Sequence, residues 1–262
     1  MSQNIIKKRS FWGNVLYTVA PALSIVFLIL IWFMASKANS VLVPTPVAVF
    51  KRFLKTFSVK ISGQYIWGHI WASLRRVLIA LAFSCGLGIP FGILLGWNKK
   101  AEATLGTLFE LIRPIPPIAW LPLVIMLMGI GETPKVVIVF IGTFTPMVLN
   151  TATSIKLVDP LYLNVGRMFN ANNRKLLFGI ALPASLPAIF AGLRTATSGG
   201  LMVVMAAEMI GAQAGLGFLI QRGMDAFDVP LIMVGMIVIG VVGALLAIIT
   251  NYVEKWVCHG AY

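Results

Sequence analysis

The sequence predicts an all-α integral membrane protein with six membrane-spanning helices. Its 262 residues are 59% hydrophobic and 11% charged, and the mean hydropathy is +0.92. A soluble domain has about 25% charged residues. Apolar runs that approach the roughly 20 residues needed to cross a bilayer recur along the chain. We expect spans at residues 15–35, 73–96, 112–130, 135–155, 186–210 and 229–250.

The first apolar run, from Val15 to Met34, follows the basic residues Lys7, Lys8 and Arg9. It is longer than the core of about 7–15 residues in a usual signal peptide, so we interpret it as a retained helix. Basic residues favour the cytoplasmic side, which predicts a cytoplasmic N-terminus and, with six spans, a cytoplasmic C-terminus. In this arrangement the adjacent residues 75 and 76, both arginines, count among the outer-loop residues.

Between the first two spans, apolar residues recur at helical spacing among basic ones. The pattern predicts a short amphipathic helix on the membrane surface. Its apolar residues are Val47, Phe50, Leu54 and Phe57, and its basic residues are Lys51, Arg52, Lys55 and Lys60.

The second predicted span is rich in glycine, and small residues allow helices to approach closely in lipid. We therefore expect a packing face there, and another along the glycines of the sixth span. The glycines of the second span are Gly86, Gly88, Gly92 and Gly96.

The third predicted span begins with four prolines in the nine residues 114–122. Each proline removes a backbone donor and restricts the residue before it, so a regular helix cannot run through this segment. The pattern fits either a surface turn before the span or a bent segment that lines a pathway. Pro116, Pro117 and Trp120 are candidate pathway residues.

Two charges, Arg194 and Glu208, fall in the interior of a long apolar stretch, within the fifth predicted span. Along one helix they would lie about 21 Å apart, so they cannot pair with each other. Intramembrane charges are costly and usually mark a partner or a pathway. Glu208 is interpreted either as a structural or gating residue bonded to a neighbouring helix, or as a pathway residue. For Arg194 the candidate partners are the preceding loop, a lipid phosphate or a substrate anion.

The loop 156–183 predicts two short helices around a polar turn. Leu161, Val165 and Phe169 recur at helical spacing in the first helix, and Arg174 begins a second helix that Pro183 is expected to stop. The apolar stripe of the first helix indicates a protein partner.

Several other classes lack support in the sequence. The chain has no GxxxxGK[ST] motif, so it cannot cradle nucleotide phosphates itself. The cysteines and histidines are isolated, which predicts no metal, cofactor or catalytic cluster. The net charge of +13 is spread over loops, which argues against nucleic acid. A channel or secondary transporter is the alternative class, although no internal repeat supports it.

An ordered set of segments resembles the permeases of binding-protein-dependent ABC transporters, specifically the nitrate/sulfonate/taurine type. The segments cover residues 40–250. They are Val43–Pro46, Trp71–Arg76, Arg113–Trp120, Gly129–Glu132, the EAA loop (Asn164–Asn170, Leu182–Pro187 and Gly192–Arg194), Ala207–Ile210 and Gly215–Gly217.

The loop departs from the family pattern at three positions. Asn164 and Gly166 stand where the family has glutamate and alanine, and Asn170 stands where a glycine makes the turn. Asparagine tolerates a left-handed backbone better than other non-glycine residues, so we expect the turn to be kept.

The resemblance implies a MetI-like permease fold with a cytoplasmic helix-turn-helix coupling loop. It also implies one permease domain over residues 1–262, with an extra helix in 1–40, a core at 70–255 and the coupling loop at 156–183. The residues expected to contact the ATPase are Leu161, Val165, Gly166, Phe169, Asn170, Arg174 and Pro183.

The partners implied are a cytoplasmic ABC ATPase dimer, a periplasmic or lipid-anchored solute-binding protein, a second permease subunit in a homodimer, and membrane lipid. The substrate implied is a small anion or organosulfonate of the taurine, alkanesulfonate, nitrate or bicarbonate class. A heterocyclic vitamin precursor is the alternative.

Overall fold

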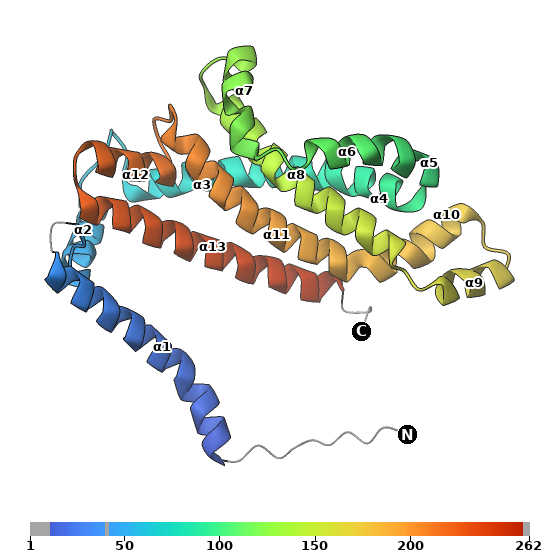
Figure 1. Cartoon of the computed structure of the whole chain (residues 1–262), viewed down its shortest axis with the longest axis horizontal. Coiled ribbons are helices and arrows are strands. Elements are labelled where there is room, and N and C mark those ends of the chain that lie inside the picture. The colour runs from blue at the N-terminus through green and yellow to red at the C-terminus, as the bar shows by residue number, and fades with distance from the viewer. Residues whose placement is uncertain (1–10, 40–41, 259–262) are drawn as a thin grey trace.

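The structure, a computed structural model, describes residues 11–39 and 42–258, and these residues form helices without a strand (Figure 1). The elements are α1 (Phe11–Ala38), α2 (Pro46–Ser58), α3 (Ile66–Phe83), η1 (Ser84–Gly88), α4 (Ile89–Trp97), α5 (Lys99–Ala101), η2 (Glu102–Gly106), α6 (Thr107–Ile112), η3 (Pro117–Trp120), α7 (Leu121–Met128), α8 (Glu132–Lys156), α9 (Pro160–Met168), α10 (Asn173–Leu176), η4 (Leu177–Ala181), α11 (Leu182–Met209), α12 (Leu216–Asp225) and α13 (Val229–Val257).

Four helical segments in the described part of the chain are long and apolar enough to cross a membrane. They are Ile66–Trp97, Glu132–Lys156, Asn173–Met209 and Val229–Val257. A bent pair, Lys99–Ile112 with Pro117–Met128, makes a fifth if it counts as one span. The first predicted span falls in α1, whose apolar portion Leu23–Ala38 is shorter than these four segments. By length and composition, the structure therefore supports four or five of the six predicted spans.

The bundle has two distinct ends. Figure 1 shows α8, α11 and α13 running between an end that has α9 and α10 and an opposite end that has α2 and α12. The main core joins α3, α8 and α11 through Val77, Val139, Met147 and Val204, all with no measurable exposure. Burial of such apolar side chains holds these helices in a fixed mutual arrangement.

The predicted glycine packing face exists on α4. A Cβ on Gly92 would lie 2.6 Å from Thr151 Cβ, and one on Gly96 would lie 2.7 Å from the Ala152 oxygen, both on α8. Gly88 faces Met147 of the same helix. Gly86 differs, because a Cβ there would meet no atom within 4 Å. Three of the four glycines therefore allow the backbones of α4 and α8 to approach closely.

The predicted span over residues 112–130 is not one straight helix, as its prolines indicate. The segment expected as a loop before it, Lys99–Ile112, is helical, and the chain then bends by 85° into Pro117–Met128. Pro114 and Pro116 lie in the bend, where they end one helix without leaving backbone donors unsatisfied. The bent-segment alternative therefore describes the geometry.

The second helix of the loop 156–183 does not stop at Pro183. Instead, α10, η4 and α11 form one helical segment from Asn173 to Met209. In the π turn η4 the Leu182 N–H bonds to the Leu177 oxygen, five residues back. This widened turn directly precedes Pro183, which has no N–H to donate, so the helix continues past the proline.

Two other elements refine the predictions. The predicted amphipathic helix is α2, which Thr45 caps, and Phe50 and Leu54 on its apolar face are exposed. Its contact with a membrane surface stays a prediction. α12, which follows residue 215, is packed against α11 and α13, with Leu216 and Leu219 fully buried.

We expect Gly92→Ala to lower the free energy of unfolding by about 1–3 kcal/mol, because the added methyl overlaps the backbone and Thr151 of α8. Titration with SDS measures this effect. Gly86→Ala is the matched control and should change stability by much less, since its methyl meets open space. Equal losses in the two variants would contradict the packing assignment.

Candidate functional site

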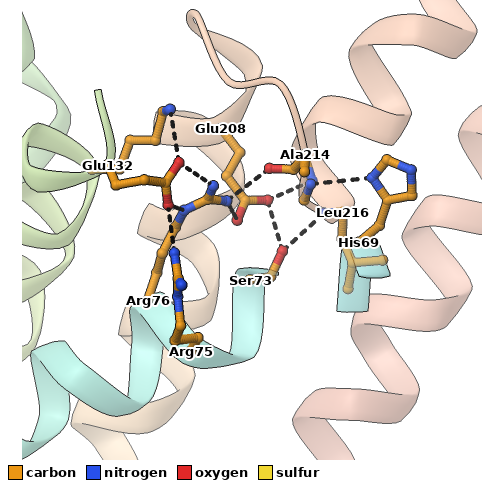
Figure 2. A network of polar contacts seen from close by, with 11 residues as sticks. His69, Ser73, Arg75, Arg76, Glu132, Glu208, Ala214 and Leu216 are labelled. Carbon is orange, nitrogen blue, oxygen red and sulfur yellow. Dashed lines mark hydrogen bonds and ion pairs between the residues drawn. The ribbon is translucent and has the colours of Figure 1, made fainter. Parts of the chain in front are cut away.

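Glu208, in the last turn of α11, is fully buried and pairs with Arg76 of α3. Its Oε1 accepts from Arg76 Nη1 at 2.6 Å, and the Arg76 side chain is 2% exposed. Figure 2 shows this pair at the centre of a larger polar network. The partner of Glu208 is thus in the same chain, on a helix more than 130 residues earlier in the sequence.

Arg76 also binds Glu132, the first residue of α8. Its Nε donates to Glu132 Oε2 at 2.8 Å and its Nη2 donates to Glu132 Oε1 at 2.7 Å, which makes a bidentate pair. Nη1 reaches the Ala214 oxygen at 2.8 Å as well. A single guanidinium therefore joins α3, α8, α11 and the loop before α12.

The other oxygen of Glu208 caps the N-terminus of α12. Glu208 Oε2 accepts from the Gly217 N–H at 2.9 Å and from Ser73 Oγ at 2.8 Å. Ser73 Oγ in turn accepts from the Leu216 N–H at 2.8 Å. Because the first N–H groups of a helix have no partner within it, a carboxylate and a hydroxyl at this point satisfy them and interact favourably with the helix dipole.

His69 completes the cap. Its Nδ1 accepts from the Gly215 N–H at 3.2 Å, and its Nε2 lies 3.1 Å from the Ile61 oxygen. A neutral imidazole with its proton on Nε2 satisfies both contacts. His69 therefore links the turn at residues 61–64 to the loop before α12.

The glycines of the Gly215-Leu216-Gly217 sequence are required by this cap. Gly215 has φ of +136°, which disfavours other residues, and a Cβ there would lie 2.3 Å from the Glu208 carboxyl carbon. A Cβ on Gly217 would lie 2.3 Å from the Met205 oxygen. The carboxylate thus packs directly on the backbone that it caps.

Sequence reasoning missed most of this network. It placed residues 75 and 76 in an outer loop, whereas the structure places both in α3 and buries Arg76. The available signal was that Arg76 directly precedes the apolar run Val77–Phe83, where a charge requires a partner. Nothing in the local sequence of Ser73, His69 or Glu132 indicates that they belong to the network around Arg76 and Glu208.

Arg194 has a partner that the sequence did not predict. Its Nη1 donates to Glu254 Oε2 at 2.5 Å and to Asn251 Oδ1 at 3.0 Å, both on α13. Glu254 is 8% exposed. Arg194 therefore joins α11 to α13.

The candidate pathway residues at the proline bend lie apart from the network. Trp120 lines an apolar cavity of about 390 Å³ between α6 and α8, together with Phe91, Phe109, Phe140 and Phe144. Pro117 begins the short 3₁₀ helix η3 that leads into this wall, and Pro116 precedes it. None of the network residues lines this cavity.

The loop helix α9 exposes a stripe of apolar side chains. Leu161 is 61% exposed, Val165 43% and Phe169 83%. Gly166 is buried on the other side, where a Cβ would lie 2.6 Å from a Leu176 methyl carbon. Within this single chain, the fold of the loop therefore leaves the apolar stripe exposed.

The turn after α9 has the predicted left-handed residue. Asn170 has φ of +56°, and the Ala171 N–H bonds to the Gly166 oxygen at 3.0 Å. Asn172 then caps the next helix by accepting from the Lys175 N–H at 2.9 Å. Arg174 is exposed in that helix. An asparagine thus makes a turn that usually needs glycine.

The fold and the site together define a multi-pass helical membrane protein with a buried ion pair at one end and an exposed two-helix loop at the other. A family model described as a binding-protein-dependent transport system inner membrane component matches residues 88–258.

Two relatives and one solved structure agree with this match. The taurine transport system permease protein TauC of Escherichia coli is 34% identical over 181 residues, which are 69% of this chain and 66% of that protein. The nitrate import permease protein NrtB of Synechocystis is 30% identical over 247 residues, 91% of this chain and 89% of that protein. The inward-facing MetNI methionine ABC transporter shares the fold, with a TM-score of 0.61 at 19% identity over 75% of this chain and 97% of that chain.

The chain therefore belongs to the family of binding-protein-dependent transport system inner membrane components. It is a multi-pass inner-membrane permease subunit of an ABC importer.

We expect Arg76→Leu to lower the free energy of unfolding by about 3–5 kcal/mol, because Glu208 is left buried without its counter-charge. The double variant Arg76→Leu with Glu208→Gln should recover part of this loss, since the neutral amide still accepts from Gly217 and Ser73. Unfolding in SDS measures both variants. A double variant that is less stable than Arg76→Leu would show that the charge of Glu208 is not the source of the loss.

Proposed function

We propose that this permease imports a small anion, either an organosulfonate such as taurine or an inorganic oxyanion such as nitrate. The observation that supports this class is the similarity to permeases named for taurine and nitrate over most of the chain. The charge of Glu208 is compatible with an anionic cargo, because Arg76 compensates it within hydrogen-bond distance.

In this proposal the exposed stripe of α9 binds a separate cytoplasmic ABC ATPase, whose dimer supplies ATP hydrolysis. An exposed apolar stripe such as Leu161, Val165 and Phe169 is usually buried against apolar side chains of a partner protein. Gly166, Asn170 and Arg174 then form the turn and the second helix of the contact. Pro183 lies in the helix that continues from this contact.

The continuous helix from Asn173 to Met209 is the proposed connection between the two ends of the protein. ATPase closure would move α10, and the rest of this helix would follow as a packed body. Its far end holds Glu208, bonded to α3 and to the start of α12. We therefore assign Glu208 a gating role at the outer end, and Arg194 a positioning role through α13.

The proposed complex contains two copies of this permease, with the proline bend at Pro116 and Pro117 and the side chain of Trp120 near the pathway. α1 is the first of six spans and an extra helix outside the core at 70–255. Both termini are cytoplasmic, the loop 156–183 lies on the same side, and α2 lies on lipid at the outer face. A periplasmic or lipid-anchored solute-binding protein delivers the substrate there.

The function is tested by reconstituting the permease with its ATPase and solute-binding protein in liposomes. We expect ATP-dependent uptake of radiolabelled taurine or ¹⁵N-nitrate. Uptake of a thiamine-type heterocycle in place of these anions would contradict the proposed class. Uptake without ATP would point to a channel or secondary transporter instead.

The ATPase contact is tested with Phe169→Asp. A carboxylate in the centre of an apolar contact is left without a partner, so we expect the ATPase to be lost on co-purification. Phe227→Asp is the matched control, because Phe227 is equally exposed at the opposite end of the bundle, at 92%. If Phe169→Asp keeps its ATPase and transports normally, the coupling assignment is wrong.

A further inference from the structure

A polar cavity of about 410 Å³ lies beside the buried ion pair. Arg75, Arg76 and Glu132 line it, together with Ser62, Gln64 and Gln213. These residues come from α3, α8 and the two loops that the network joins. The cavity is therefore open to solvent on one side and reaches the guanidinium of Arg76 on the other.

The charges around the cavity do not balance. Among the residues that the structure describes, Glu208 forms an ion pair with Arg76 alone. Glu132 forms ion pairs with Arg76 at 2.7 Å, Arg75 at 3.3 Å and Lys135 at 3.5 Å. Three cations therefore face two carboxylates. The positive surplus lies on the cavity side, where the Arg75 side chain is 52% exposed.

The guanidinium edge of Arg76 that faces Glu132 does not depend on Glu132 for its position. Nη1 is fixed by Glu208 and by the Ala214 oxygen, so the Nε and Nη2 hydrogens keep their direction if Glu132 leaves. These two donors present the fork that binds planar oxyanions in a bidentate manner. The carboxylate of Glu132 occupies the position that such an oxyanion would take.

Glu132 is suited to leave this position. Its side chain is 48% exposed, so a displaced carboxylate would be hydrated at little cost. It follows Gly129, which has φ of +77°, and Gly131, where a Cβ would meet no atom within 4 Å. The amides of Gln64 and Gln213 and the hydroxyl of Ser62 provide further donors at the cavity wall.

We propose that this cavity is an oxyanion-binding site and that Glu132 is its resident counter-ion, which an incoming nitrate or sulfonate group displaces from Arg76 and Arg75. The identity of the oxyanion rests on the proposed function. The site itself follows from the fixed guanidinium edge, the surplus positive charge and the half-exposed carboxylate.

The proposal is tested with the permease purified in nanodiscs, titrated calorimetrically with sodium nitrate and sodium methanesulfonate at constant ionic strength. We expect Glu132→Gln to tighten oxyanion binding by roughly 2- to 5-fold, because the internal competitor is removed. Arg75→Gln should weaken it by a similar factor. Lys55→Gln, which removes the same charge from α2 away from the cavity, should leave the affinity as in the wild type.

Three results would overturn the proposal. The first is that Glu132→Gln and Arg75→Gln both leave the oxyanion affinity unchanged. The second is that Lys55→Gln lowers the oxyanion affinity as much as Arg75→Gln does. The third is absence of free-oxyanion binding to the permease while Arg75→Gln weakens capture of the solute-binding protein, which would assign the site to a protein carboxylate. Uptake by the wild-type complex separates this proposal from the proposed function: uptake without binding overturns only the site, and binding without uptake overturns only the transport assignment.

Discussion

The contact between Arg76 and Glu208 is the centre of a network that holds together α3, α8, α11 and α12. Burial of two charges has a large desolvation cost, which is offset only when the geometry is good and the remaining donors and acceptors are bonded. Here the carboxylate is bonded to Arg76, Ser73 and the Gly217 N–H, and the guanidinium to Glu208, Glu132 and the Ala214 oxygen. Removal of one member leaves the others unsatisfied, so α3, α8, α11 and α12 are fixed at this end as one unit.

The same pair makes the loop before α12 dependent on the core. The N-terminus of α12 is capped by side chains from α3 and α11 rather than by a residue of its own. A movement of α11 therefore changes the cap directly. Arg194, at the middle of α11, ties this helix to Glu254 of α13. The helix is thus held by ionic contacts at its middle and in its last turn, and its core residues Ala196, Leu201 and Val204 lie between them.

The continuity of this helix past Pro183 is what relates the two ends physically. A break at the proline would have separated the loop helix from the span. The π turn before Pro183 widens the helix so that no backbone donor is needed from the proline. In the proposed mechanism, a motion of the exposed α9–α10 pair acts on the full length of Asn173–Met209. In a permease of an ABC importer, this gives a direct mechanical route between the proposed ATPase contact and the buried ion pair.

Composition and periodicity determined the helical membrane class, the position of most spans, the amphipathic helix α2 and the two-helix loop. These features depend on local preferences and on the apolar length of each segment. The left-handed backbone at Asn170 was predictable from the family resemblance, which places the turn there, together with the tolerance of asparagine for that conformation. The tertiary structure alone decided the partners of the buried charges. Arg76 and Glu208 are separated by 132 positions, and Arg194 and Glu254 by 60. It also decided the passage through Pro183 and the burial of α12. These features depend on which helix faces align in space, and no local pattern encodes that alignment.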